Sequence, residues 1–429
     1  MPFKKSKQLR LGASMAALIA VVQPAYAETF QFHAEHVLGT SLDFQAEARS
    51  QGAANLAFEA ALAEIKRLES LFSTWSDVSE ISRLNQERHA SVSVETANLL
   101  ERCEYWREET QGALDCRLGD LINTWHNNTS PAGLDNSQLD TLLRQVKSTT
   151  LSIKGDKASL TGNASLRVDA LAKGVILDAA ANAAQRVSPD IQGVLVNIGG
   201  DIRTVGRFGE KGVRVGVAGP NASDAEAPAE TIWLTEGAIA SSGASGRDIK
   251  IGARKASHII SPFTGRPQDI VETVTVVAPT AEAADALATA FAVTGVANSL
   301  GYANTHDGVE TVIITRGGSR FASDGWSNLR AEVETLSAEA AGVENPWQDD
   351  WSLEVGYEIP KVDASDYEYP YVVAWITDAE NKPVRHLLML GDSPRWLEEN
   401  YVHWLASRGP EKPCCGGSYS KANAAAGAL

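Results

Sequence analysis

The feature that most constrains the fold is the uneven mixture of helical and strand-like periodicity along the chain. Between Gln51 and Phe72, apolar residues recur at helical spacing among Glu and Lys, which predicts an amphipathic helix. Further helices are expected at Val94–Thr110 and Ala172–Val187. Because helices and strands do not alternate regularly, the sequence predicts a layered α+β fold rather than a doubly wound sheet. The expected strands are Gly193–Ile198, Gly212–Val217, Thr231–Leu234, Val271–Ala278 and Thr311–Thr315.

The N-terminal segment has the pattern of an export signal. Four basic residues within the first ten positions precede an apolar run at 11–22, and Ala25-Tyr26-Ala27 matches a cleavage site. We therefore expect residues 1–27 to be a signal peptide and the mature protein to be periplasmic. The apolar run is shorter than the ~20 residues that span a bilayer, so a membrane anchor is the weaker alternative and no stable membrane insertion is expected.

The net charge and the cysteine content limit which ligands and metals the chain is expected to bind. The chain has 38 Lys and Arg residues against 54 Asp and Glu residues, a net charge of −16. Such a surface repels phosphate backbones, so no nucleic-acid partner is expected, and a polyphosphate ligand would need a metal bridge. Cys103 and Cys116 could form a disulfide or remain two separate thiols, and no cysteine spacing suggests a zinc site. The other two cysteines are Cys414 and Cys415.

Composition changes after about residue 336. Residues 337–345 are rich in small and acidic residues and are expected to be a linker. Residues 346–409 contain half of the ten tryptophans and strand-like runs at Trp351–Ile359 and Tyr371–Thr377, which indicates a small β-rich domain. Residues 410–429 lack an apolar pattern, which predicts a disordered tail.

Four groups of residues could carry chemistry, and the first two contain glycine and a charged side chain. The turn Gly112–Asp115 could hold a ring edge or a ribose hydroxyl, although Asp115 could equally cap a helix. Asp169–Gly174 is interpreted as a loop entering a helix that contains Asp178. The backbone amides at the start of this helix and the positive charge of Lys173 could bind phosphate oxygens. The alternative is that Lys173 is a solvated lysine on a helix surface.

The other two groups offer hydroxyl, imidazole and carboxylate side chains. Val196–Asp201 is interpreted as a buried strand that ends in two glycines, which would bring its backbone against a flat ligand. Ser241–Ser245 follows an apolar strand and offers hydroxyl and amide donors, although ordinary turns explain either segment equally well. On a helix, Asp285 and Thr289 would share one face and could bind one hard cation, although a solvated helix face is the alternative. His258 is a candidate base or a structural hydrogen-bonding residue.

The order and spacing of these motifs resemble the ApbE-like FAD:protein FMN transferases. The resemblance also includes Gly39-Thr40, Phe72–Trp75 and Ser79–Asn85, and it continues to the strand near Thr315. It implies a T-fold-related transferase domain over residues 28–336. The tryptophan-rich segment is similar to a periplasmic domain of unknown function that continues with further strands, which suggests a truncated domain here.

The resemblance also implies a reaction and a site. The implied reaction is the Mg²⁺-dependent transfer of FMN from FAD to a Thr or Ser hydroxyl of an exported flavoprotein, with release of AMP. Hydrolysis of FAD to FMN and AMP, and flavin binding without catalysis, are the alternatives. His258 is the implied base, and the Mg²⁺ ligands would be Asp285, Thr289 and the carbonyl of Ala170. The implied FAD-binding residues are Leu38, Trp75, Ala113, Leu114, Asp115, Asp169, Lys173 and Ile260.

Three positions depart from the pattern of this family. Arg167 stands where the family has the Asp of Asp-Leu-x-x-x-Ala-Lys-Gly, so either the Asp is replaced or Asp169 takes its place. Ser261 replaces the Asp of the His-x-x-Asp-Pro-x-Thr-Gly motif. Ala288 is apolar where some members have a second Asp beside the metal. These departures predict weaker metal binding or slower turnover than in typical members.

Overall fold

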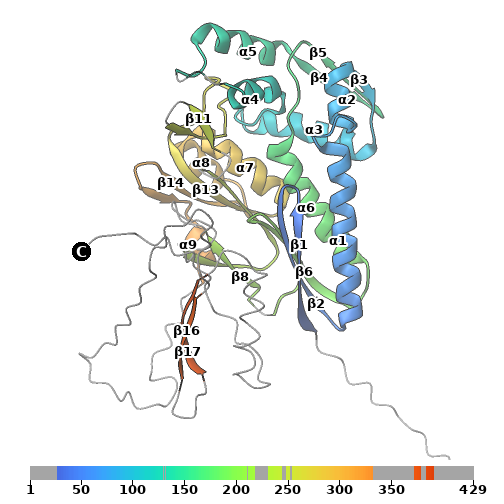
Figure 1. The fold of residues 1–429 in the computed structure, drawn as a ribbon, viewed down its shortest axis with the longest axis vertical. Helices are drawn as coiled ribbons and strands as arrows, with labels where there is room; N and C mark the ends of the chain where they lie inside the picture. The colour runs from blue at the N-terminus through green and yellow to red at the C-terminus, as the bar shows by residue number, and fades with distance from the viewer. Residues whose placement is uncertain are drawn as a thin grey trace, which may run out of the picture.

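The computed structural model describes residues 27–331, except 129, 131, 210, 218–229, 244–247 and 252–253, and two further strands. At its centre is an antiparallel sheet of eight strands in the order β1-β2-β6-β7-β10-β13-β14-β15 (Figure 1). The strands are β1 (Glu28–Val37), β2 (Thr40–Ala48), β6 (Ile191–Ile198), β7 (Asp201–Gly206), β10 (Gly237–Gly243), β13 (Val271–Ala278), β14 (Glu310–Thr315) and β15 (Arg320–Ala322).

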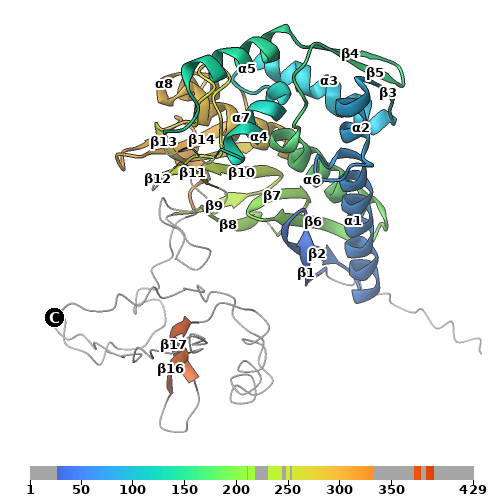
Figure 2. The same cartoon turned by 45° about the horizontal axis from the view of Figure 1, so that its top comes forward.

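Three helices pack on one face of this sheet: α1 (Gln51–Phe72), α6 (Asp169–Arg186) and α7 (Ala281–Thr294) (Figure 2). Helix α6 contacts both of the others, and its buried face is rich in alanine, as is that of α7. Gly174 marks the closest approach, because a Cβ there would lie 2.4 Å from the carbonyl oxygen of Ala281. Small residues therefore allow α6 and α7 to pack close together on this face of the sheet.

The opposite face and the end of the sheet are covered by smaller elements. The hairpin of β8 (Val213–Val217) and β9 (Glu230–Leu234) packs with α9 (Trp326–Leu329), around the buried Trp326, against the sheet. The remaining elements are α2 (Glu80–Glu87), β3 (His89–Ser91), α3 (Val94–Glu109), the 3-10 helix η1 (Cys116–Leu118), α4 (Gly119–His126), α5 (Asn136–Ser148), β4 (Thr150–Lys154), β5 (Lys157–Thr161), β11 (Ile249–Ile251), β12 (Arg254–Ala256) and α8 (Val296–Ala303).

The predicted elements are largely confirmed. Helix α1 and strand β13 have the predicted bounds, and the α+β class is confirmed. The expected start of helix α6 at Ala172, with a loop before it, was wrong, because α6 already begins at Asp169. Leu171 and Ala172 continue its buried face, and no helix-breaking residue lies between Asp169 and Ala172. Among the described residues, no helix is both long and apolar enough to cross a membrane.

In the C-terminal part of the chain, the described residues form one β-hairpin. Strand β16 (Val372–Thr377) pairs antiparallel with β17 (Pro383–Leu390), and β16 lies in the predicted strand Tyr371–Thr377. Four other predicted segments lie outside the described residues. They are the linker 337–345, the strand Trp351–Ile359, the tail 410–429 and nearly all of the signal peptide.

A disulfide joins Cys103 of α3 to Cys116 of η1, with their Cα atoms 5.9 Å apart. This pairing decides between the two alternatives that the sequence left open. Both cysteines are buried, and Cys116 also lines one of the cavities described below. Stable disulfides are typical of proteins that fold outside the cytoplasm.

We expect Cys103→Ser to lower the free energy of unfolding by roughly 2–4 kcal/mol, because the disulfide restricts the unfolded chain. Urea denaturation of the variant and the wild type, each with and without a reductant, measures this difference. Reductant should destabilise the wild type to the level of the variant and leave the variant unchanged. A wild type that resists reductant and matches the variant in stability would contradict the prediction.

Candidate active site

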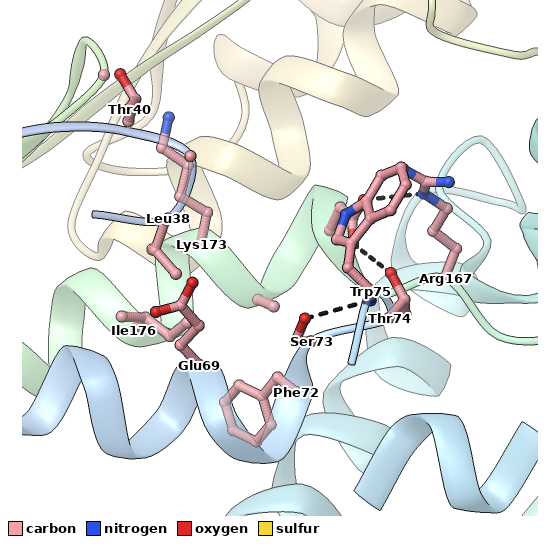
Figure 3. A pocket seen from close by; sticks show the side chains of 14 residues that line it. Leu38, Thr40, Glu69, Phe72, Ser73, Thr74, Trp75, Arg167, Lys173 and Ile176 are labelled. Atoms are coloured by element: carbon pink, nitrogen blue, oxygen red, sulfur yellow. Dashed lines mark hydrogen bonds and ion pairs between the residues drawn. The ribbon is translucent and has the colours of Figure 1, made fainter. Parts of the chain in front are cut away.

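Two cavities adjoin at the N-terminal end of α6 and share four residues: Trp75, Arg167, Asp169 and Lys173. We call these four residues the ridge. The first cavity has a volume of about 640 Å³ and lies between the end of α1, α6 and the β1–β2 turn (Figure 3). The second has a volume of about 410 Å³ and is lined from α6, α7, β10 and the loops at 113–116 and 258–260. An elongated ligand could therefore extend across the ridge from one cavity into the other.

Every residue that the sequence predicted for the site lines at least one of these cavities. Leu38 lines the first cavity, and Trp75, Asp169 and Lys173 line both. The fold thus brings together residues that are up to 251 positions apart in the sequence, Leu38 and Thr289. The predicted residues that line only the second cavity are Ala113, Leu114, Asp115, Ala170, His258, Ile260, Asp285 and Thr289.

Asp285 and Thr289 lie one turn apart on α7 and form an oxygen-rich corner of the second cavity. An oxygen of the buried Asp285 carboxylate accepts a hydrogen bond from the Gly174 amide at 3.0 Å. The hydroxyl of Thr289 is 3.4 Å from that of Ser242 on β10. The described residues hold no group of three or more His, Cys, Asp or Glu that could bind a metal. One carboxylate with neutral oxygens fits Mg²⁺, which keeps waters and takes further ligands from phosphates.

The beginning of α7 is fixed against α6 by a second, partly buried carboxylate, that of Asp178. The two oxygens of Asp178 accept hydrogen bonds from the amides of Ala281 and Glu282, at 3.0 and 2.9 Å. Arg203 forms an ion pair with Asp178 at 2.8 Å. Burial raises the pKa of Asp178, and the hydrogen bonds and Arg203 oppose this shift. These contacts fix the position of the helix that presents Asp285 and Thr289.

Lys173 forms an ion pair with the buried Asp201 that the sequence did not predict. Its Nζ lies 2.8 Å from an oxygen of Asp201, whose other oxygen accepts a hydrogen bond from the Ser241 amide at 3.2 Å. Asp201 also lines the second cavity. The available signal was its position directly after the paired glycines at 199 and 200, where a strand ends. Asp201 therefore orients Lys173 toward the cavities.

His258 is mostly buried and lies beside an acidic residue that sequence reasoning also missed. The Nδ1 atom of His258 is 3.9 Å from a carboxylate oxygen of Asp248. This distance is too long for a hydrogen bond but allows electrostatic stabilisation of a protonated imidazole. A second imidazole, that of His126 on α4, lines the same cavity, although the sequence offered no reason to assign it a role. No motif marks Asp248 or His126 in the sequence.

Three side chains at or near the cavities serve the local structure. The carboxylate of Asp115 caps η1 and forms an ion pair with Arg117 at 2.6 Å, as the helix-cap alternative expected. Ser261 accepts a hydrogen bond from the Phe263 amide at 3.3 Å, so a serine can serve as acceptor in this turn. Ala288 is fully buried in the main core and lines neither cavity.

Comparison with known proteins places this fold and site in a class. A model of the ApbE family matches residues 38–313, which is more than half of the chain. The chain belongs to the ApbE family. A second family model, described as a predicted periplasmic protein (DUF2271), matches residues 352–428 and so extends into the segment for which we predicted a disordered tail.

Relatives and solved structures agree with this membership. The chain is 27% identical to an FAD:protein FMN transferase of Haemophilus influenzae, covering 63% of this chain and 82% of that protein. It is 32% identical to one of Vibrio cholerae, covering 54% and 71%. The crystal structure of the ApbE protein of Thermotoga maritima superposes with a TM-score of 0.63 at 26% identity, covering 71% of this chain and all of that one. The predicted family, fold and class of enzyme, a flavin transferase, are therefore confirmed.

Proposed function

We propose that this protein transfers FMN from FAD to a Thr or Ser hydroxyl of an exported protein, in a Mg²⁺-dependent reaction that releases AMP. The observation that carries the proposal is that the second cavity brings together an oxygen-rich corner, a lysine and an imidazole from separate segments. The names of the curated relatives support the same chemistry. The departures at Arg167 and Ser261 do not remove any of these groups from the cavity.

The substrate would lie across the ridge. Trp75 is 79% exposed and offers an aromatic surface on which the isoalloxazine ring can stack. Lys173 would contact the diphosphate, since it lines both cavities. Asp285, Thr289 and the carbonyl of Ala170 would hold Mg²⁺, and the bound ion would offset negative charge on the diphosphate and on the leaving AMP.

The bond changes follow from this arrangement. The acceptor hydroxyl oxygen would attack the phosphorus of the FMN half, so that a new P–O ester bond forms. The P–O bond to the AMP phosphate breaks, and AMP leaves with the bonding electron pair. His258 would take the proton of the hydroxyl, and Asp248 would stabilise the resulting imidazolium.

We further propose that the protein acts in the periplasm. The signal pattern at residues 1–27 supports export of the domain at 28–336. The Cys103–Cys116 disulfide supports an oxidising compartment. The family matched at the C-terminal end is itself described as a predicted periplasmic protein.

Incubation with FAD and Mg²⁺, with and without an extract of periplasmic proteins, tests the proposed reaction. Chromatography measures AMP and free FMN, and denaturing gels detect covalently bound flavin by fluorescence. We expect AMP release together with a fluorescent protein band that depends on the extract. Equal amounts of AMP and free FMN, without a labelled band, would indicate hydrolysis instead. Tight FAD binding without AMP would indicate a non-catalytic flavin-binding protein.

A further inference from the structure

Arg167 occupies the ridge with its guanidinium fixed on two sides. Its Nε donates to a carboxylate oxygen of Asp169 at 2.8 Å, and one terminal nitrogen donates to the side-chain oxygen of Asn123 at 3.0 Å. Only 15% of the side chain is exposed. Its backbone amide donates to the carbonyl of Cys116 at 2.7 Å, so the main chain is also fixed. The guanidinium therefore has a defined place between the cavities.

Trp75 meets this guanidinium through its ring. The Cζ atom of Arg167 lies 5.0 Å from the centre of the Trp75 ring, within the range of a cation–π interaction (Figure 3). The backbone of Trp75 is anchored by a hydrogen bond from its amide to the Ser73 hydroxyl at 3.2 Å. The ring itself has no aromatic neighbour among the described residues, and most of its surface is exposed. Arg167 is thus a contact that can restrict rotation of the ring.

We infer that Arg167 is a positioning residue that holds one face of Trp75 and leaves the other for the isoalloxazine ring. This inference rests on the proposed function, because it requires that the chain binds flavin. If Arg167 replaces the Asp of the family pattern, the replacement matters, because an aspartate could not make a cation–π contact. The planar guanidinium can stack on the ring while its N–H groups bind Asp169 and Asn123, which a lysine could not do.

A different role for Arg167 predicts a different pattern of ligand binding. If the guanidinium contacted the diphosphate, its loss would weaken FAD, which has two phosphates, and would spare riboflavin, which has none. If it positions Trp75, both ligands should weaken by a similar factor, because both contain the isoalloxazine ring. Comparison of the two ligands therefore separates a contact to phosphate from a contact made through the ring.

The experiment measures the Kd values of riboflavin and FAD for the full chain and for Arg167→Gln, without Mg²⁺, by quenching of flavin fluorescence. We expect both Kd values to rise by between about threefold and thirtyfold, the range of a cation–π contact. In a Trp75→Ala background, Arg167→Gln should cause no further loss of riboflavin affinity. Asn123→Ala, which only frees the guanidinium on one side, should give a smaller rise in the same direction.

Arg214→Gln is the matched control, since Arg214 lies 6.0 Å from the Trp233 ring on the β8–β9 hairpin and lines neither cavity. It should leave both Kd values unchanged. Loss of FAD affinity alone, or a full effect of Arg167→Gln in the Trp75→Ala background, would overturn the inference. Unchanged flavin affinity in Arg167→Gln, with normal binding by the wild type, would overturn it without touching the proposed function. A wild type that binds no flavin, even after Mg²⁺ is added, would defeat both.

Discussion

Asp285→Asn should reduce flavin transfer from FAD at least about a hundredfold, because an amide is a much weaker ligand for a hard cation than a carboxylate. The substitution is conservative for the fold. The amide oxygen of Asn can still accept the hydrogen bond from Gly174, so the close contact of α6 with α7 is retained. The loss should therefore appear in catalysis and in metal binding rather than in stability.

The measurement is AMP release as a function of Mg²⁺ concentration, together with the unfolding midpoint of each variant. Asp140→Asn, an exposed position on α5 that lines neither cavity, is the matched control and should behave like the wild type. The variant should need far more Mg²⁺ for half-maximal rate. Full transfer at the wild-type Mg²⁺ concentration would remove Asp285 from the proposed set of ligands.

Much of the fold was predictable because its strongest patterns are local. The 22 residues of α1 repeat apolar positions at helical spacing, and Ser50 caps the helix through the Ala53 amide. Strand β13 is rich in valine and is buried from Val274 to Ala278, as expected for a strand covered on both faces. The edge strand β1 was missed although Phe30, Phe32 and Ala34 alternate with exposed polar residues, because this short stretch is the only part of a mostly exposed strand that carries the pattern.

The sequence could predict those site residues that belong to local motifs, but not the contacts between distant segments. The spacing of Asp285 and Thr289 requires only a helix to place both on one face, and α7 supplies it. Asp248 and the contact of Arg167 with Trp75 could not be predicted, because they depend on tertiary packing between distant segments. Helix α6 was expected only from Ala172, and packing of the buried Leu171 extends it back to Asp169.

His258→Asn should lower kcat for flavin transfer by roughly 10²- to 10⁴-fold, the usual contribution of a general base, while the Kd for FAD stays within a few-fold of the wild type. The imidazole of His258 lines the second cavity, as Asp285 and Thr289 do, so an acceptor hydroxyl that enters this cavity could reach it. Asp248→Asn should cause a smaller loss, since it removes the negative charge 3.9 Å from Nδ1 but leaves the base in place.

His126 supplies the decisive comparison, because its imidazole lines the same cavity from α4. The Nδ1 atom of His126 lies 2.9 Å from the carbonyl of Ile122, which leaves Nε2 as the nitrogen that could act as a base. Single-turnover rates and FAD affinities of His258→Asn and His126→Asn, with His306→Asn as an exposed control outside both cavities, separate the two imidazoles. Loss of kcat in His126→Asn with normal rates in His258→Asn would transfer the proposed base to α4. Because FAD affinity is measured in parallel, a fall in binding alone would instead mark His258 as a residue that holds the substrate.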